Sequence, residues 1–262
     1  VITSKVGNWI ILEANWLVIT KNLHLYFFGS YPKSELWRPL VWISVLAILT
    51  LITIVNVNRK LLSKFITSLW LIIIPIGIYL LGGGFGLEPV ASRSWGGLTL
   101  TLILTGMSSI IALPLGIVLA LCRISNIKII NTVSRLYINS MRSFPLIAVL
   151  FFGQLLIPLF LPMNYEINRV FRAILAFGLF TSAYVAEDIR GGLQSIPKTQ
   201  KEAAEALGFS QLKIYQLIIL PQAIRIAIPA LTNQAIGLLQ NTSLMAILGL
   251  VELLGISRSL LA

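Results

Sequence analysis

The chain has 262 residues, of which 57% are hydrophobic and only 11% are charged, against roughly 25% charged residues in soluble domains. This composition, with a mean hydropathy of +0.90, excludes an ordinary soluble protein. It predicts an all-α, polytopic membrane protein, because helices satisfy their own backbone polar groups in lipid. The net charge of +11 would suit nucleic-acid binding, but the basic residues are scattered between apolar segments and fit positively charged loops beside a lipid membrane better.

The first part of the chain, residues 1–95, is predicted to be an N-terminal extension. Aromatic residues scattered among charges in residues 1–38 are typical of a membrane interface. The apolar run 10–19 is too short to cross a bilayer and predicts an interfacial helix. Two transmembrane helices are expected at 39–57 and 66–81.

Residues 96–262 are predicted to form the core of the protein. Three further spans are expected at 98–122, 144–161 and 171–189. The connections after the first, third and fifth spans carry twelve of the twenty Lys and Arg residues. Because cytoplasmic loops are rich in Lys and Arg, these connections are predicted to be cytoplasmic and residues 1–38 external.

A mixed-polar segment, residues 191–221, follows the fifth span and is predicted to be a cytosolic helix–turn–helix. Its first helix is rich in Ala, Glu and Lys, which are good helix formers, and Pro197 suits the first turn. Gly208 is expected to end this helix, since glycine accepts the left-handed conformation of a C-terminal cap. A second, short amphipathic helix is expected to end at Pro221.

The chain is then expected to re-enter the membrane over 224–239, in a helix interrupted by Pro229 and by polar residues. Polar groups at membrane depth are costly unless they face protein or a water-filled cavity, so they mark candidate substrate pathways. The candidate pathway residues are Asn233, Gln234, Gln240 and Asn241. The alternative is that 240–243 is an external turn.

No catalytic or metal site is predicted. The chain has one histidine and one cysteine, too few for a zinc site or a Ser/His/Asp triad. A phosphate-binding Gly-x-x-x-x-Gly-Lys-Ser/Thr motif is absent, so a partner or an ion gradient must supply the energy. Glu187, Asp188 and Arg190 could form a proton relay, but pairing of these side chains at the membrane interface is the favoured interpretation.

The helix–turn–helix carries a motif of fixed spacing. Glu202-Ala203-Ala204 is followed by Gly208, and nine residues later the chain reads Ile218-x-Leu220-Pro221. This pattern resembles the EAA loop of permeases of binding-protein-dependent ABC importers. The segments 97–102, 141–146, 183–198, 241–244 and 251–254 are similar to the polar-amino-acid uptake family. The aromatic N-terminal part resembles the general L-amino-acid permease branch.

The resemblance implies a type I ABC importer permease fold, in the plasma (inner) membrane of a bacterium. It implies a second permease subunit, an external or periplasmic amino-acid-binding protein, and a cytosolic ABC ATPase dimer. The ATPase would bind the ATP, and this chain would hold no cofactor. The resemblance assigns contact with the ATPase to seven residues: Glu202, Ala203, Ala204, Gly208, Ile218, Leu220 and Pro221.

Two other classes of protein remain open on the sequence alone. An ion-gradient-driven secondary amino-acid transporter would explain the spans and polar residues but not the spacing of the motif. A structural or assembly membrane protein would need no polar pathway. The family core has five spans and the last is not evident here, and the chain does not begin with methionine, so truncation at both ends is expected.

Overall fold

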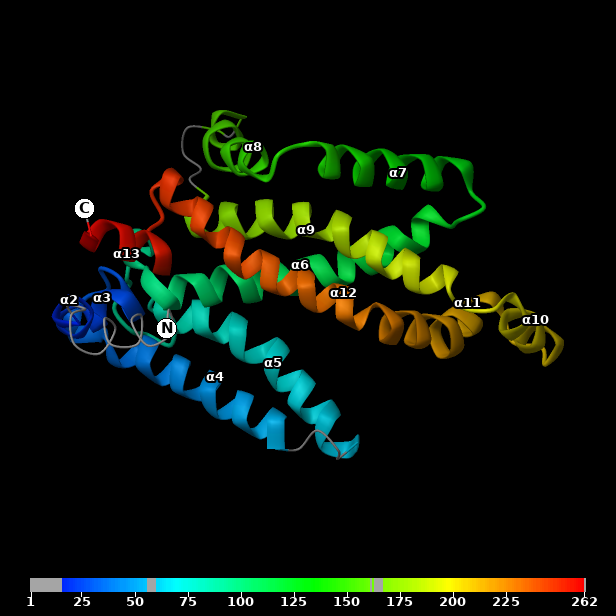
Figure 1. Ribbon diagram of the computed structural model, residues 1–262, viewed down its shortest axis with the longest axis horizontal. Helices are drawn as coiled ribbons and strands as arrows, with labels where there is room; N and C mark the ends of the chain where they lie inside the picture. The colour runs from blue at the N-terminus through cyan, green and yellow to red at the C-terminus, as the bar shows by residue number, and fades with distance from the viewer. Residues whose placement is uncertain (1–15, 56–59, 161, 163–166, 262) are drawn as a thin grey trace, which may run out of the picture.

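The computed structural model describes residues 16–55, 60–160, 162 and 167–261 of the chain, and these are almost entirely helical (Figure 1). Two short helices, α2 (Leu17–Lys21) and α3 (Leu23–Phe28), lie at the N-terminal end. Most of the predicted interfacial run 10–19 lies outside the described residues, and its end forms part of α2. A 3-10 turn at Lys33–Glu35 leads into the first long helix.

The first two predicted spans correspond to α4 (Trp37–Val55) and α5 (Lys60–Leu81). The apolar part of α5, Phe65–Leu81, is shorter than that of α4. The Trp42 indole donates a hydrogen bond to the Ile73 carbonyl at 2.9 Å. The same ring lies over Gly77, where a Cβ would be 2.1 Å from the indole nitrogen. The two helices therefore pack as a hairpin because position 77 carries no side chain.

The centre of the molecule is a packed pair of long helices, α6 (Gly97–Arg123) and α9 (Arg169–Gln194). Both confirm predicted spans and extend them. They approach closely at small residues: a Cβ on Gly116 would be 2.4 Å from Val185, and one on Gly178 would be 3.0 Å from Ile111. Such close backbone approach is a common way of packing helices in membranes, where dispersion contacts hold them together.

The predicted span 144–161 corresponds to one helical run, Leu146–Phe160. The segment 123–142, expected to be a basic loop, instead forms the amphipathic helix α7 (Lys128–Ser143). A break at Phe144-Pro145 follows, and then α8 (Leu146–Phe151), a π turn (Phe152–Leu156) and a 3-10 turn (Ile157–Phe160). The two parts are bent by 105°. Proline restricts the residue before it to extended backbone, which explains the break.

The helix expected to end at Pro221 does not end there. After α10 (Lys198–Ala206), α11 (Gln211–Ile214) passes through a π turn (Tyr215–Ile219) into α12 (Leu220–Asn241). Pro221 occupies the first turn of α12, where its missing N–H and its ring are tolerated after the wide π turn. The predicted interruption of 224–239 is also wrong, since Pro229 lies inside α12.

The end of the chain packs beside the start of α6. A 3-10 helix (Thr242–Leu248) leads to α13 (Leu253–Leu261). The buried Glu252 carboxylate accepts hydrogen bonds from the backbone N–H groups of Leu254 and Gly255, at 2.8 and 2.6 Å, and so caps α13. Glu252 also forms an isolated β-bridge with Gly97.

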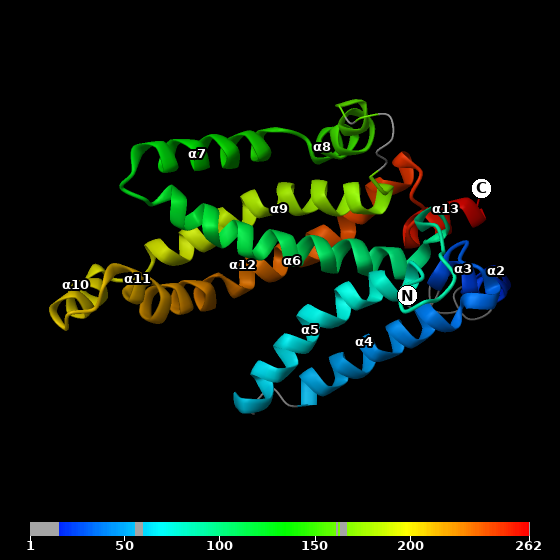
Figure 2. The same ribbon diagram turned by 180° about the vertical axis from the view of Figure 1, so that it is seen from behind.

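Two apolar clusters fill the core, one toward each end of α6 and α9. The first holds side chains from both predicted parts of the chain, among them Trp42, Leu81, Leu100 and Phe177. The second joins α6 and α9 to α10 and α12. Both views place α10–α11 and the α6–α7 turn at one end, with α3, α8 and α13 at the other (Figures 1 and 2).

Four described helices are long and apolar enough to cross a membrane, and the bent pair α7–α8 would make five. The molecule is therefore built as a polytopic membrane protein. In this arrangement the helix–turn–helix 191–221 comprises the end of α9, all of α10 and α11, and the start of α12.

Candidate functional site

The segment Glu202–Gly208 has the local structure expected from the sequence. Gly208 has φ +79°, in the left-handed region. Its N–H donates to the Glu205 carbonyl at 2.9 Å, and the Phe209 N–H donates to the Ala204 carbonyl at 3.1 Å. This pair of bonds is the Schellman pattern that closes a helix at glycine. The predicted glycine cap is therefore confirmed.

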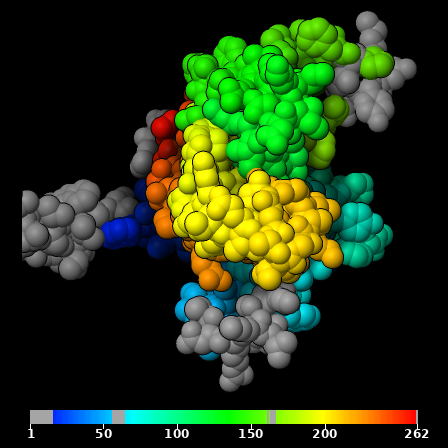
Figure 3. Space-filling view, turned by 90° about the vertical axis from the view of Figure 1, so that its right-hand side faces the viewer, coloured from blue at the N-terminus to red at the C-terminus, as the bar shows by residue number. Residues whose placement is uncertain are grey.

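The seven motif residues divide into buried anchors and exposed positions. Ala204 is buried, and the half-buried Ile218 and Leu220 pack against the same apolar cluster. The other four motif residues, Glu202, Ala203, Gly208 and Pro221, are exposed. Figure 3 shows this segment at the centre of the end of the molecule that faces the viewer. The motif thus presents a surface while holding its own backbone to the core.

Polar contacts fix α10 against the two elements that follow it. The Gln222 amide donates to the Gln200 side chain at 2.7 Å, which joins α12 to α10. The Gln211 amide donates to Glu205 at 2.6 Å, and Lys201 lies 3.8 Å from the same carboxylate. Side-chain contacts therefore connect α10 to both α11 and α12.

A pocket of about 410 Å³ lies where the C-terminal half of α12 faces α9. Its walls come from the α7–α8 break, α9 and α12, and its polar lining is supplied by Thr181, Tyr184, Gln234 and Asn241. A second cavity of about 400 Å³, mostly apolar, lies between α6, α9 and α12 and shares Thr181 and Gln234. The first pocket combines apolar walls with a few polar groups, as small-molecule sites do.

The four candidate pathway residues do not share one surface. Gln234 and Asn241 line the polar pocket, whereas Asn233 and Gln240 are exposed on a different face of α12. Sequence analysis missed Thr181 and Tyr184 as pocket residues. A signal was present, because these two residues and Asp188 recur at i, i+3 and i+7 within an apolar helix, and therefore lie on one face.

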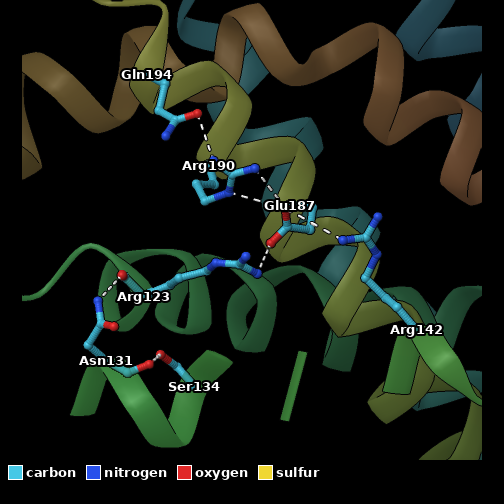
Figure 4. Close-up of polar contacts among 7 residues, drawn as sticks. All are labelled: Arg123, Asn131, Ser134, Arg142, Glu187, Arg190 and Gln194. Atoms are coloured by element: carbon cyan, nitrogen blue, oxygen red, sulfur yellow. Dashed lines mark hydrogen bonds and ion pairs between the residues drawn. The ribbon is translucent and has the colours of Figure 1, made fainter. Parts of the chain in front are cut away.

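Glu187 is the centre of an ion-pair cluster between α6, α7 and α9 (Figure 4). Arg123 donates a hydrogen bond to one carboxylate oxygen, and Arg190 donates two to the other, at 3.1 and 2.8 Å. Arg142 Nη1 lies 3.6 Å from that second oxygen. The Glu187 side chain is only 14% exposed, so these partners compensate a largely desolvated charge. This arrangement confirms local pairing of Glu187 and Arg190.

The cluster adjoins the polar pocket. The Arg142 guanidinium lies over the Tyr184 ring, 5.6 Å from its centre, and Tyr184 lines the pocket. The Asp188 carboxylate is close enough to the Gln234 side chain and to Arg142 for both to affect it electrostatically. The second oxygen of the Asp188 carboxylate, Oδ2, is buried without a hydrogen-bond partner. Charged groups thus lie next to Tyr184 and Gln234, two residues of the pocket wall.

The described residues contain no group of three or more His, Cys, Asp or Glu side chains that could hold a metal ion.

Comparison with known proteins agrees with this arrangement. The family described as binding-protein-dependent transport system inner membrane component matches residues 112–259. The inner membrane amino-acid ABC transporter permease protein YhdY of Escherichia coli K12 is 40% identical, over 94% of this chain and 71% of its own length. The glutamate/aspartate import permease protein GltK of Escherichia coli O6:H1 is 38% identical, over 60% of this chain and 72% of its own.

A solved structure, titled as an amino acid ABC transporter with histidines, has a chain that is 32% identical to this one. It superposes with a TM-score of 0.55 over 63% of this chain and 75% of its own. The predicted all-α, type I ABC importer permease fold is confirmed. Membership of this family leaves the ion-gradient-driven alternative without support. The chain belongs to the inner-membrane components of binding-protein-dependent transport systems and is a permease subunit, the membrane-spanning part of an ABC importer.

Proposed function

We propose that this permease carries amino acids and that the exposed part of the EAA motif is the surface on which an ATPase partner docks. One observation carries the proposal: α12 is a single helix that begins in the motif, at Leu220, and contributes Gln234 and Asn241 to the polar pocket. Leu220 and Gln234 are fourteen residues apart, or about 21 Å along a helix at 1.5 Å per residue. A force applied at the motif therefore reaches the pocket through one rigid element.

The coupling mechanism follows from the division of the motif. An ATPase dimer that closes on ATP would press on α10 at Glu202 and Ala203. The small side chain at position 203 allows close approach of a partner groove, and Glu202 supplies a charge at its edge. The buried Ala204 and the contact between Gln222 and Gln200 would transfer the movement to α12. ATP would be bound and hydrolysed by the partner, and this chain would take no part in that chemistry.

We place the substrate in the polar pocket, delivered by an external binding protein and shared with a second permease subunit. The relatives named for amino acids, and the neighbouring structure whose title includes histidines, support this substrate class. Asn233 and Gln240 are exposed on α12, and polar groups at membrane depth are costly in lipid. We therefore assign these two residues to the surface that meets the second permease subunit or a shared water-filled path.

The proposal is tested by reconstituting the full-length permease in proteoliposomes with its permease partner, ATPase and binding protein. ATP hydrolysis would be measured while L-glutamate, L-glutamine, L-arginine and L-histidine are added in turn. We expect binding protein loaded with at least one of them to stimulate hydrolysis, with uptake that requires ATP. Uptake that follows a proton or sodium gradient and ignores ATP would contradict the proposal.

A further inference from the structure

Arg142 is the least constrained of the three arginines around Glu187. Arg123 and Arg190 already hydrogen-bond both oxygens of that carboxylate. Arg142 approaches only to 3.6 Å, beyond hydrogen-bonding distance, and its side chain is 41% exposed, against 19% and 28% for the other two. Its guanidinium donors are therefore the ones available to a ligand.

The charges around Arg142 leave a surplus of positive charge beside the pocket. Three guanidinium groups, those of Arg123, Arg142 and Arg190, face two carboxyl groups, those of Glu187 and Asp188. Three minus two leaves at least one cation without a matching anion. The residues that line the pocket itself are uncharged. An anionic group that enters the pocket would therefore be attracted toward the side on which Arg142 lies.

The backbone around Arg142 brings its side chain to this side of the pocket. Arg142 is in the last turn of α7, directly before the break whose residues Phe144, Pro145 and Leu146 form one wall of the pocket. Its guanidinium lies on the Tyr184 ring, which forms another wall. A planar guanidinium can bind a carboxylate with two parallel hydrogen bonds, which makes arginine the preferred partner of that group.

We propose that Arg142 recognises the α-carboxylate of the transported amino acid and so selects for an intact main-chain carboxyl group. This inference rests on the proposed function, because it requires an amino acid in the polar pocket. Arg142 lies 3.6 Å from the Glu187 carboxylate and interacts electrostatically with Asp188. When ligand enters, the guanidinium turns to the ligand carboxylate, while Arg123 and Arg190 continue to neutralise Glu187.

The test compares each amino acid with its α-carboxamide, which has the same side chain and ammonium group but no anionic carboxylate. The full-length permease, assembled with its permease partner and purified in nanodiscs, would be titrated with L-glutamate, L-glutamine, L-arginine and L-histidine and with the four amides. We expect the wild-type protein to bind at least one acid more tightly than its amide by roughly 10-fold or more, as a hydrogen-bonded charge pair provides.

Three variants locate that preference. Arg142→Gln should bind acid and amide equally, at the affinity of the amide. Arg142→Lys keeps the charge but not the fork of donors, and should retain only part of the preference. Arg135→Gln is the matched control, because Arg135 is exposed, lies on the same helix about 10 Å away at 1.5 Å per residue, and removes the same charge; it should behave as wild type.

The outcomes separate this inference from the proposed function. If Arg142→Gln still prefers the amino acid to its amide as strongly as the wild type does, the role of Arg142 is overturned while amino-acid binding stays intact. If the Gln variant does not assemble, a full preference in Arg142→Lys has the same meaning. Equal wild-type binding of acid and amide would overturn it too. Binding of no amino acid by the wild-type protein would overturn the pocket assignment itself, and this inference with it.

Discussion

At the scale of single residues, the Glu187 cluster shows which contacts a sequence reveals. The pair between Glu187 and Arg190 follows from their spacing, since residues three apart meet on a helix surface. The other two arginines lie on other helices. Arg123 precedes Glu187 by 64 residues in the sequence, and Arg142 precedes it by 45 (187 − 142). No local pattern brings them to one carboxylate, because that meeting depends on how α6 and α7 pack on α9.

Replacement of Glu187 by Gln should destabilise the protein. It removes the anion that compensates Arg123 and Arg190 at a site where the carboxylate is only 14% exposed. We expect a loss of about 2 kcal/mol, between the values typical of surface pairs and of buried pairs. Equilibrium unfolding in mixed micelles of dodecylmaltoside and dodecyl sulfate would measure it.

The matched control for this change is Glu205→Gln. Glu205 pairs with Lys201 at 3.8 Å, and both side chains are 42% exposed, so the free energy of unfolding should change by less than about 0.5 kcal/mol. Equal effects of the two substitutions would show that the Glu187 cluster contributes no more than a solvated pair.

At the scale of helices, hydrophobic length was a sound guide and the position of breaks was not. The spans 98–122 and 171–189 were predicted within a few residues, because long apolar segments in lipid have few alternatives to helix. Only the later prolines were misinterpreted. Pro145 precedes the helical run Leu146–Phe160, in agreement with the predicted start of the span 144–161. Pro221 and Pro229, in contrast, lie within a helix that was predicted to stop. The π turn at Tyr215–Ile219 directly precedes Pro221, and no pattern in the sequence predicts it.

The same limit applies to the candidate site. The helix–turn–helix and its glycine cap could be predicted, since their signal is local. The pocket could be predicted only in part, because it needs the α7–α8 break to form one wall. Gln234 and Asn241 were found as polar residues in an apolar helix. Their neighbours Asn233 and Gln240 are equally polar but lie on another face of α12. Which of the two faces meets α9 depends on how α12 is rotated about its axis, and the sequence does not show that rotation.

Substitutions at Gly208 can distinguish the effect of backbone strain from the effect of side-chain size. Any side chain there must adopt φ near +79°, which costs of order 1 kcal/mol, but no atom lies within 4 Å of a Cβ at this position. Gly208→Ala and Gly208→Trp therefore carry the same strain, while only tryptophan projects bulk from the exposed surface. We expect Trp to abolish the stimulation of ATP hydrolysis by loaded binding protein and Ala to retain most of it.

Two measurements accompany these variants. Membrane insertion and the amount of purified permease should be similar for both, because the site is exposed. If loaded binding protein stimulated ATP hydrolysis in Gly208→Trp as strongly as in the wild type, the assignment of this surface to the ATPase would be contradicted.

At the scale of the whole molecule, the N-terminal extension and the core are packed together. Trp42 and Leu81 of residues 1–95 lie in the same apolar cluster as Leu100 and Phe177 of the predicted core. The Arg38 side chain, 1% exposed, is held by Glu35 at 2.7 Å and by the Glu88 carbonyl at 2.8 Å, and so joins the two ends of the α4–α5 hairpin. Whether the boundary at 95/96 separates two folding units stays a prediction, as does the side of the membrane that each end faces.

The distribution of basic residues predicts that sidedness, and cysteine labelling would test it. Cys122 is the single cysteine, so Cys122→Ser gives a background into which Ser34→Cys and Ser210→Cys can be placed one at a time. Both serines are exposed, Ser34 before α4 and Ser210 between α10 and α11. Because the loops richest in Lys and Arg remain cytoplasmic, a membrane-impermeant maleimide should label position 34 in intact spheroplasts and position 210 only in inside-out vesicles. Labelling of both positions from one side would overturn the topology, and exposure of position 210 to the outside would remove the EAA motif from the reach of a cytosolic ATPase.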